Sequence, residues 1–110
     1  MEAKNVKNEA LTYFKAVPKR HNCAQSVAAG AGKEDLVQEL AACGGGRAPE
    51  GLCGALYAVL RLAPASEHER IRKAFAAKAG AETCRAIKTG SGFPCEECVR
   101  LAAELSEEFL

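Results

Sequence analysis

The chain has 110 residues, 48% of them hydrophobic and 26% charged, so we expect one globular domain over 1–110 and no long disordered segment. Fifteen basic and fourteen acidic residues give a net charge of +1, and only 5% of the residues are aromatic. These values exclude the basic surface and the base-stacking platforms of nucleic-acid-binding proteins. Because no apolar run is long enough for a membrane span or a signal peptide, we expect a cytoplasmic protein.

In the first half of the chain, apolar residues recur at the three- and four-residue spacing of amphipathic helices. The pattern predicts a first helix over 2–17 and a third helix over 33–43, which the glycine run at 44–46 ends. Between them we expect a short second helix that opens at Cys23, because Asn22 stands in the N-cap position ahead of it.

The second half predicts three further helices and one short helical turn, at 49–63, 67–79, 94–108 and 81–88. The helix over 49–63 is almost wholly apolar and is expected to be the most buried. Ser66 and Glu69 form the signature of a capping box, and Gly80 suits a left-handed helix end. Pro94 is tolerated in the first turn of the last helix. No alternating apolar pattern appears, so the expected fold is an all-α, single-domain bundle of about five to six helices.

The six cysteines carry the strongest functional signal, because packing alone does not need so many in a chain of this length. They are Cys23, Cys43, Cys53, Cys84, Cys95 and Cys98. Four of them fall in or near the first turn of a predicted helix, where unpaired amides and the helix dipole stabilise a thiolate: Cys23, Cys53, Cys95 and Cys98. In a reducing cytosol such a set favours metal ligation or transient redox chemistry over structural disulfides.

Cys95 and Cys98 form a Cys-x-x-Cys pair, which can close as a reversible disulfide or supply two metal ligands. Val99 follows where c-type haem attachment needs a histidine, so no haem is expected. On the predicted last helix both sulfurs lie on the inward-facing stripe. His21 stands two residues before Cys23, where it is either a partner for a thiolate or a solvated turn residue.

Several short motifs occur together in one order. They are Asn22-Cys23-Ala24-Gln25-Ser26-Val27, Gly44-Gly45-Gly46, Cys53-Gly54-Ala55, Cys84-Arg85 and Cys98-Val99. With this order and spacing, from about residue 20 to 105, the chain resembles the redox-active family C_GCAxxG_C_C, named for its Cys-Gly-Ala-x-x-Gly motif. The resemblance implies a small helical redox protein with an undefined reaction, and a similar module of split-Soret cytochromes is associated with an iron-sulfur centre. Ala58 stands where the family has its final glycine.

By this resemblance, the four signature cysteines of the family correspond to Cys23, Cys53, Cys84 and Cys98. We expect these four to gather at one end of the bundle, as catalytic thiols that undergo reversible oxidation or electron transfer. In the alternative they ligate an iron-sulfur cluster or zinc, and in a third interpretation the chain is a non-catalytic interaction module whose cysteines are core residues.

The remaining candidates are accessory residues for cofactor binding: Cys43, Cys95, Gly44, Gly45 and Gly46. The cysteines could serve as accessory ligands or resolving thiols, and the glycines either let the backbone approach a sulfur or cluster closely or only end a helix. The expected partner is a redox protein or a small thiol, with no nucleic acid and no membrane. The sequence also allows for a homodimer.

Overall fold

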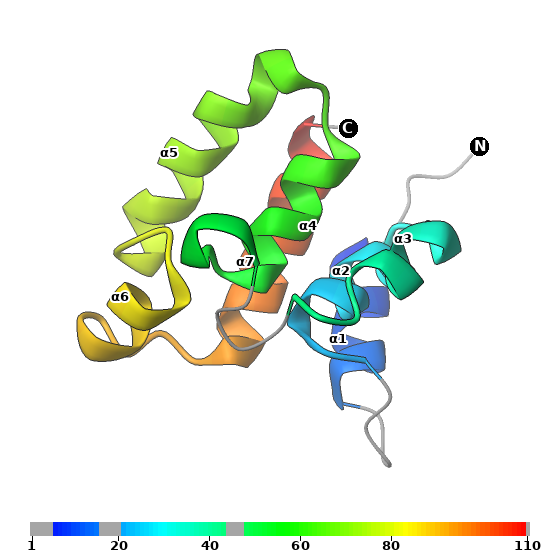
Figure 1. The fold of residues 1–110 in the computed structure, drawn as a ribbon, viewed down its shortest axis with the longest axis horizontal. Helices are drawn as coiled ribbons and strands as arrows, with labels where there is room; N and C mark the ends of the chain where they lie inside the picture. Colours follow the sequence, from blue (N-terminus) through cyan, green and yellow to red (C-terminus); the bar gives the residue numbers. More distant parts are fainter. Residues whose placement is uncertain (1–5, 16–20, 44–47, 110) are drawn as a thin grey trace.

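The computed structural model describes residues 6–15, 21–43 and 48–109, and these residues contain helices and no β-strand (Figure 1). The predicted all-α class is therefore confirmed. The elements are α1 (Val6–Lys15), α2 (Cys23–Gly30), α3 (Glu34–Glu39), η1 (Pro49–Gly51), α4 (Gly54–Leu62), η2 (Ala65–Glu67), α5 (His68–Ala79), α6 (Cys84–Thr89) and α7 (Cys95–Phe109). Here η1 and η2 are single 3₁₀ turns.

Helices α4 and α7 pack side by side at the centre of the molecule, with α1 and α2 against one flank and α5 against the other (Figure 1). The core between them is built from aliphatic residues and one aromatic ring. Its largest fully buried side chains include Leu40, Leu56, Val59, Ile71, Phe75, Ile87 and Val99. The helix expected to be the most apolar, α4, buries most of its residues, as its sequence predicts.

The capping box at the start of α2 confirms the predicted helix start at Cys23. The Asn22 side chain accepts a hydrogen bond from the Gln25 N–H at 2.7 Å, and the Gln25 side chain accepts one from the Asn22 N–H at 3.0 Å. At the other end of α2, a Cβ on Gly30 would lie 2.7 Å from the backbone nitrogen of Ala10. This glycine therefore lets α1 and α2 pack closely.

The predicted helix over 49–63 is wrong in its first turns. Glu50 and Gly51 have φ angles of +62° and +72°, which lie in the left-handed region and cannot continue an α-helix. The chain instead makes the turn η1 and begins α4 at Gly54. Cys53 is consequently the N-cap residue of α4, one position before the helix rather than inside its first turn.

The predicted helix over 33–43 is also too long, since α3 ends at Glu39 and Cys43 lies beyond it. The Asn22 side-chain amide donates hydrogen bonds to the carbonyls of Leu40 and Ala41, each at 3.1 Å. These carbonyls are thereby held by α2's N-cap residue instead of by a following helical turn. The glycine run at 44–46 and the predicted ends of the first helix lie outside the described residues.

The predicted capping box at Ser66 and Glu69 is wrong, whereas the predicted end of the same helix is confirmed. Extended backbone at Pro64 starts a 3₁₀ turn at Ala65, so Ser66 already lies inside helical structure and no side chain caps α5. Gly80 ends α5 with a φ of +94°, as its residue type predicts.

The last helix begins one residue later than predicted. Pro94 precedes α7, and its carbonyl accepts the N–H of Cys98 at 3.0 Å.

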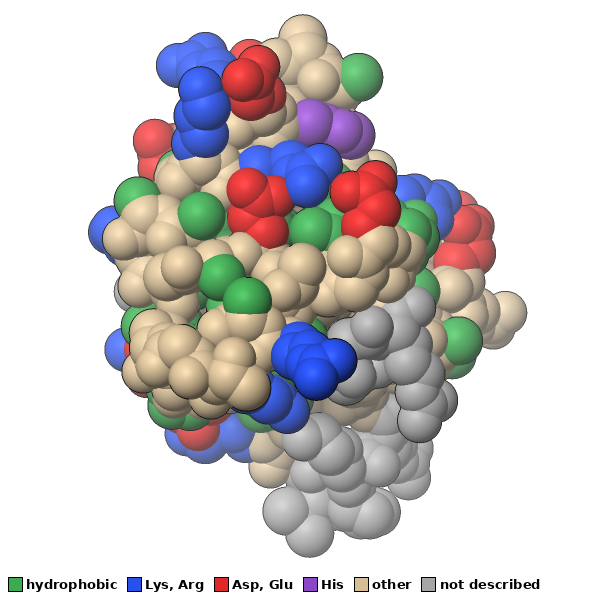
Figure 2. Space-filling model, turned by 60° about the vertical axis from the view of Figure 1, so that its left-hand side comes forward, with side chains coloured by type: hydrophobic (Ala, Val, Ile, Leu, Met, Phe, Trp, Pro, Cys, Tyr) green, Lys and Arg blue, Asp and Glu red, His purple; other side chains and the backbone are tan. Residues whose placement is uncertain are grey.

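On the face shown in Figure 2, basic and acidic side chains are interspersed, with no broad patch of one sign. Within the described part of the chain, no helix combines the length and apolar character that crossing a bilayer requires.

Candidate functional site

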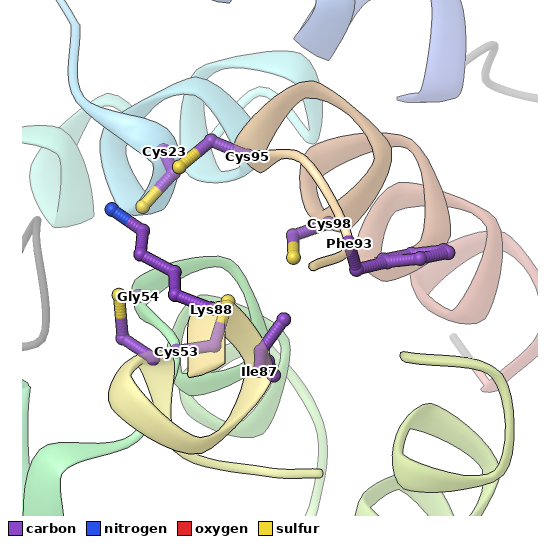
Figure 3. A pocket seen from close by; sticks show the side chains of 9 residues that line it. Cys23, Cys53, Gly54, Ile87, Lys88, Phe93, Cys95 and Cys98 are labelled. Atoms are coloured by element: carbon purple, nitrogen blue, oxygen red, sulfur yellow. The ribbon is translucent and has the colours of Figure 1, made fainter. Parts of the chain in front are cut away.

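Five of the six cysteines line one pocket, which measures about 330 Å³ when the space open to solvent is included (Figure 3). Its lining residues are Cys23, Cys53, Gly54, Cys84, Ile87, Lys88, Phe93, Cys95 and Cys98. The structure thus brings together all four cysteines that were expected to gather. It adds Cys95, which was expected only in an accessory role.

Four helices begin at this pocket, each with a cysteine. Cys23, Cys84 and Cys95 are the first residues of α2, α6 and α7, and Cys53 is the N-cap residue of α4. Because the N-terminus of a helix carries unpaired N–H groups and a partial positive charge, it favours an anion such as a thiolate. Among these four cysteines, Cys53 has a lowered pKa, whereas the pKa of Cys84 is raised by desolvation.

The two buried cysteines of the pocket, Cys53 and Cys98, act on each other directly. Their residues are 5% and 4% exposed, and their side chains are hydrogen-bonded. This bond lowers the pKa of Cys53 to about 7 against the opposing effect of burial, with smaller contributions from the Leu56 and Ala55 amides and from the charge of Lys88. The same bond, with burial, raises the pKa of Cys98. Of the two thiols, Cys53 is therefore the one that ionises more readily.

The backbone of Cys53 is held from outside its own helix. Its N–H donates to the carbonyl of Glu82 at 2.8 Å, and a single antiparallel bridge pairs Leu52 with Thr83 beside it. The Glu82 carboxylate accepts a hydrogen bond of 2.6 Å from Nε of Arg72 on α5. The position of Cys53 thus depends on a segment that α5 anchors.

Because Gly54 has no side chain, there is room for the Cys23 sulfur at the pocket. A Cβ at position 54 would lie 2.5 Å from the Cys43 carbonyl oxygen and 2.8 Å from the Cys23 Sγ. Both distances are shorter than real Cβ contacts allow, so only glycine leaves room for the sulfur and the carbonyl together. In the sequence, Gly54 stands in the motif Cys53-Gly54-Ala55, which by itself does not indicate this role.

Lys88 is a site residue that sequence reasoning missed. It lies in the last turn of α6, exposed to solvent, and lines the pocket, where its charge favours the thiolate forms of Cys53 and Cys84. For Cys84 this effect is outweighed, because desolvation raises the pKa of that thiol. Lys88 follows Cys84 by four residues, one helical turn, and this spacing is the signal that could have identified it.

Cys95 departs from its expected orientation. Both sulfurs of the Cys-x-x-Cys pair were expected to face the helical core, yet only Cys98 is buried and Cys95 is exposed. Cys95 is the first residue of α7, so no preceding helical turn covers it. It still lines the pocket and therefore stands where the pocket meets solvent.

The two glutamates between these cysteines do not line the pocket. Glu96 pairs with Lys15 at 3.5 Å, and Glu97 pairs with Arg100 at 3.4 Å. Their charges are thus partly offset by cations outside the site.

Two other candidates lie apart from the pocket lining. Cys43 contributes its backbone carbonyl to the contact with Gly54, but its side chain is not among those that line the pocket. His21 packs edge-on against the ring of Tyr13, with ring centroids 4.9 Å apart, and does not line the pocket either. Gly44, Gly45 and Gly46 lie outside the described residues, so their expected role has no structural counterpart here.

A metal centre needs several donor side chains placed around one point. In the described ranges, no group of three or more His, Cys, Asp or Glu side chains is placed so that it could hold a metal ion. As they are positioned, the described cysteines of the pocket are therefore not grouped around a single metal ion such as zinc.

Comparison with known proteins finds no matching family model, no matching curated protein and no matching solved structure. The resemblance to the C_GCAxxG_C_C family stays a prediction from the motifs.

Proposed function

We propose that this protein is a thiol-based redox protein in which Cys53 and Cys98 form a reversible disulfide. The observation that carries the proposal is the pair of buried thiols at a pocket that three further cysteines line. In the oxidation, the two side chains lose two electrons and their protons and form one S–S bond. An external disulfide, of a small thiol or of a redox protein, takes up the electrons and is cleaved to two thiols.

The electrostatics of the pair support Cys53 as the nucleophile. With its pKa lowered to about 7, Cys53 is about half ionised at neutral pH, whereas a thiol at the ordinary value of 9.0 is ionised to about 1%. Cys98 keeps its proton, because its pKa is raised by the bond to Cys53. One thiolate beside one thiol is the arrangement in which a dithiol can be oxidised stepwise.

The exposure of the cysteines argues against the interpretation as an interaction module with core cysteines. Of the five cysteines in the pocket, only Cys53 and Cys98 are buried. Cys23 and Cys84 are half-buried, and Cys95 is exposed. Core packing therefore explains the positions of two of the five cysteines. It does not explain why the other three line the same pocket.

The test is a thiol titration of the whole chain. The reduced protein is equilibrated in buffers of reduced and oxidised dithiothreitol, the remaining thiols are alkylated, and the linked peptides are identified by mass spectrometry. We expect a Cys53–Cys98 disulfide that forms and reverses while the helical circular dichroism is retained. Cys43→Ala should behave like the unmodified chain, whereas Cys53→Ser and Cys98→Ser should form no such link.

A constant thiol titre across all buffers would contradict the proposal. Elemental analysis of protein purified without oxygen tests the metal alternative in the same preparation. One zinc ion or one iron-sulfur cluster per chain would replace the thiol-exchange function by metal ligation.

A further inference from the structure

The pocket has an outer and an inner part that differ in access. Cys53 and Cys98 are 5% and 4% exposed, whereas Cys95 is exposed and lies one helical turn before Cys98. Thiol–disulfide exchange requires the attacking sulfur to approach the disulfide directly. An incoming disulfide therefore meets Cys95 before it meets the buried pair.

The pocket also holds a positive charge, that of Lys88. Lys88 is the only cationic residue among the lining residues, and within the described part of the chain it makes no ion pair. In the view of Figure 3 its side chain extends along the pocket toward Cys23. Glu96 and Glu97, the nearest acidic residues to Cys95 in the chain, are engaged with Lys15 and Arg100.

The pocket is also small. Its enclosed space is about 20 Å³, enough for a water molecule and far below the range for sites that enclose a small molecule. An external disulfide therefore reacts at the mouth of the pocket, where Cys95 is exposed, and does not enter it.

From these three features we propose that low-molecular-weight disulfides that carry carboxylates react at the mouth of the pocket, with Lys88 binding a carboxylate and Cys95 receiving the sulfur. This inference rests on the proposed function and names its substrate class. The charge on Lys88 attracts the anionic group over a few ångströms and so raises the local concentration of such molecules at Cys95.

The transfer to the buried pair proceeds in three exchanges. The Cys95 thiolate attacks the external disulfide, forms a mixed disulfide and releases one thiolate. Cys98 passes its proton to Cys53 and attacks the Cys95 sulfur, which releases the second external thiolate and leaves a Cys95–Cys98 disulfide. Cys53 then loses that proton to water and attacks Cys98, so the Cys53–Cys98 disulfide forms and the Cys95 thiolate is restored. Two electrons pass from the protein to the external disulfide.

The experiment measures the rate at which the reduced whole chain forms a mixed disulfide with three probes of different charge. These are dithiodiglycolate, which is anionic, 2-hydroxyethyl disulfide, which is neutral, and cystamine, which is cationic. Acid quenching and peptide mass spectrometry identify the first cysteine modified. We expect Cys95, and we expect the ratio of the dithiodiglycolate rate to the cystamine rate to fall about tenfold in Lys88→Glu at low salt.

Two variants control for the charge change. Lys88→Arg keeps the positive charge and should keep the ratio, which separates a charge effect from damage to α6. Lys33→Glu changes the same charge on an exposed lysine beyond the far end of α2 from Cys23, and its ratio should stay within about twofold of the unmodified chain.

An unchanged ratio in Lys88→Glu, in a protein that still forms the Cys53–Cys98 disulfide, would overturn this inference and leave the proposed function standing. The same holds if Cys95→Ser is oxidised as fast as the unmodified chain. If no probe produces a Cys53–Cys98 disulfide, the proposed function is overturned and this inference with it.

Discussion

The side chain of Cys98 on α7 is hydrogen-bonded to that of Cys53 at the start of α4. This bond is the largest influence on the pKa of each residue, lowering that of Cys53 and raising that of Cys98. The negative charge of the pair is therefore concentrated on Cys53, where the amides of Leu56 and Ala55 also stabilise it.

Removing the donor should return Cys53 toward ordinary thiol behaviour. In Cys98→Ala we expect the pKa of Cys53 to rise from about 7 toward 9.0, because the largest stabilising contact of the thiolate is lost. The thiolate fraction at pH 7 should fall by roughly tenfold or more. The pKa of Cys53 is measured by following the ultraviolet absorbance of the thiolate with pH. The absorbance of the double variant Cys53→Ala/Cys98→Ala is subtracted at each pH. Cys43→Ala serves as the control and should leave the midpoint near 7, and a midpoint that stays there in Cys98→Ala as well would contradict the assignment.

The same pair predicts how stability depends on pH. Between about pH 7 and pH 9 the folded pair has lost one proton that the unfolded chain still holds, so the free energy of unfolding rises with pH. Above pH 9 the unfolded chain loses both protons while Cys98 in the folded chain keeps its own, so the free energy falls again. The contribution at its maximum near pH 9 is about 2 kcal/mol. Urea unfolding of the reduced chain at several pH values, compared with Cys53→Ala/Cys98→Ala, measures this difference; two parallel pH profiles would refute it.

Gly54→Ala should destabilise the protein although alanine is the better helix former. The added Cβ would meet the Cys43 carbonyl oxygen at 2.5 Å and the Cys23 Sγ at 2.8 Å, and overpacking of this kind costs about 1–3 kcal/mol. This exceeds the helix-propensity gain, which is at most about 1 kcal/mol. In the double variant Cys23→Ala/Gly54→Ala the Cys23 sulfur is absent. The double variant should therefore lose less free energy of unfolding than the two single variants lose together. Denaturant unfolding of the unmodified chain, the two single variants and the double variant gives the coupling free energy between positions 23 and 54. Strictly additive losses would show that the two residues do not crowd each other.

Arg72 links Glu50, in the turn before Cys53, to Glu82, whose carbonyl accepts the Cys53 N–H. Its guanidinium bonds Glu82 at 2.6 Å and lies 3.7 Å from Glu50. In Arg72→Met we expect a loss of about 1 kcal/mol or less, because the side chains are partly exposed, together with faster hydrogen exchange of the Cys53 amide. Lys73→Met, on the same helix, removes a far more exposed pair with Glu69 and should leave that amide protected. Equal exchange rates in both variants would contradict the anchoring role.

Local patterns in the sequence determined the helical class and several helix ends. The start of α2 at Cys23 follows from a capping box within four residues, and the end of α5 follows from the left-handed conformation of Gly80. Interactions of this range depend on neighbours in the chain, so the residues themselves indicate them. The abundance of cysteines and their position near helix starts were equally visible.

Only the tertiary structure decided which of these cysteines meet and what surrounds them. The bond between Cys53 and Cys98, the exposure of Cys95 and the place of Lys88 depend on how α4, α6 and α7 pack, which no helical periodicity records. The crowding at Gly54 has the same origin, since its neighbours come from α2 and from the segment after α3. Helix periodicity specifies which side of a helix is buried, whereas the partner of that side is chosen by packing between segments far apart in the chain.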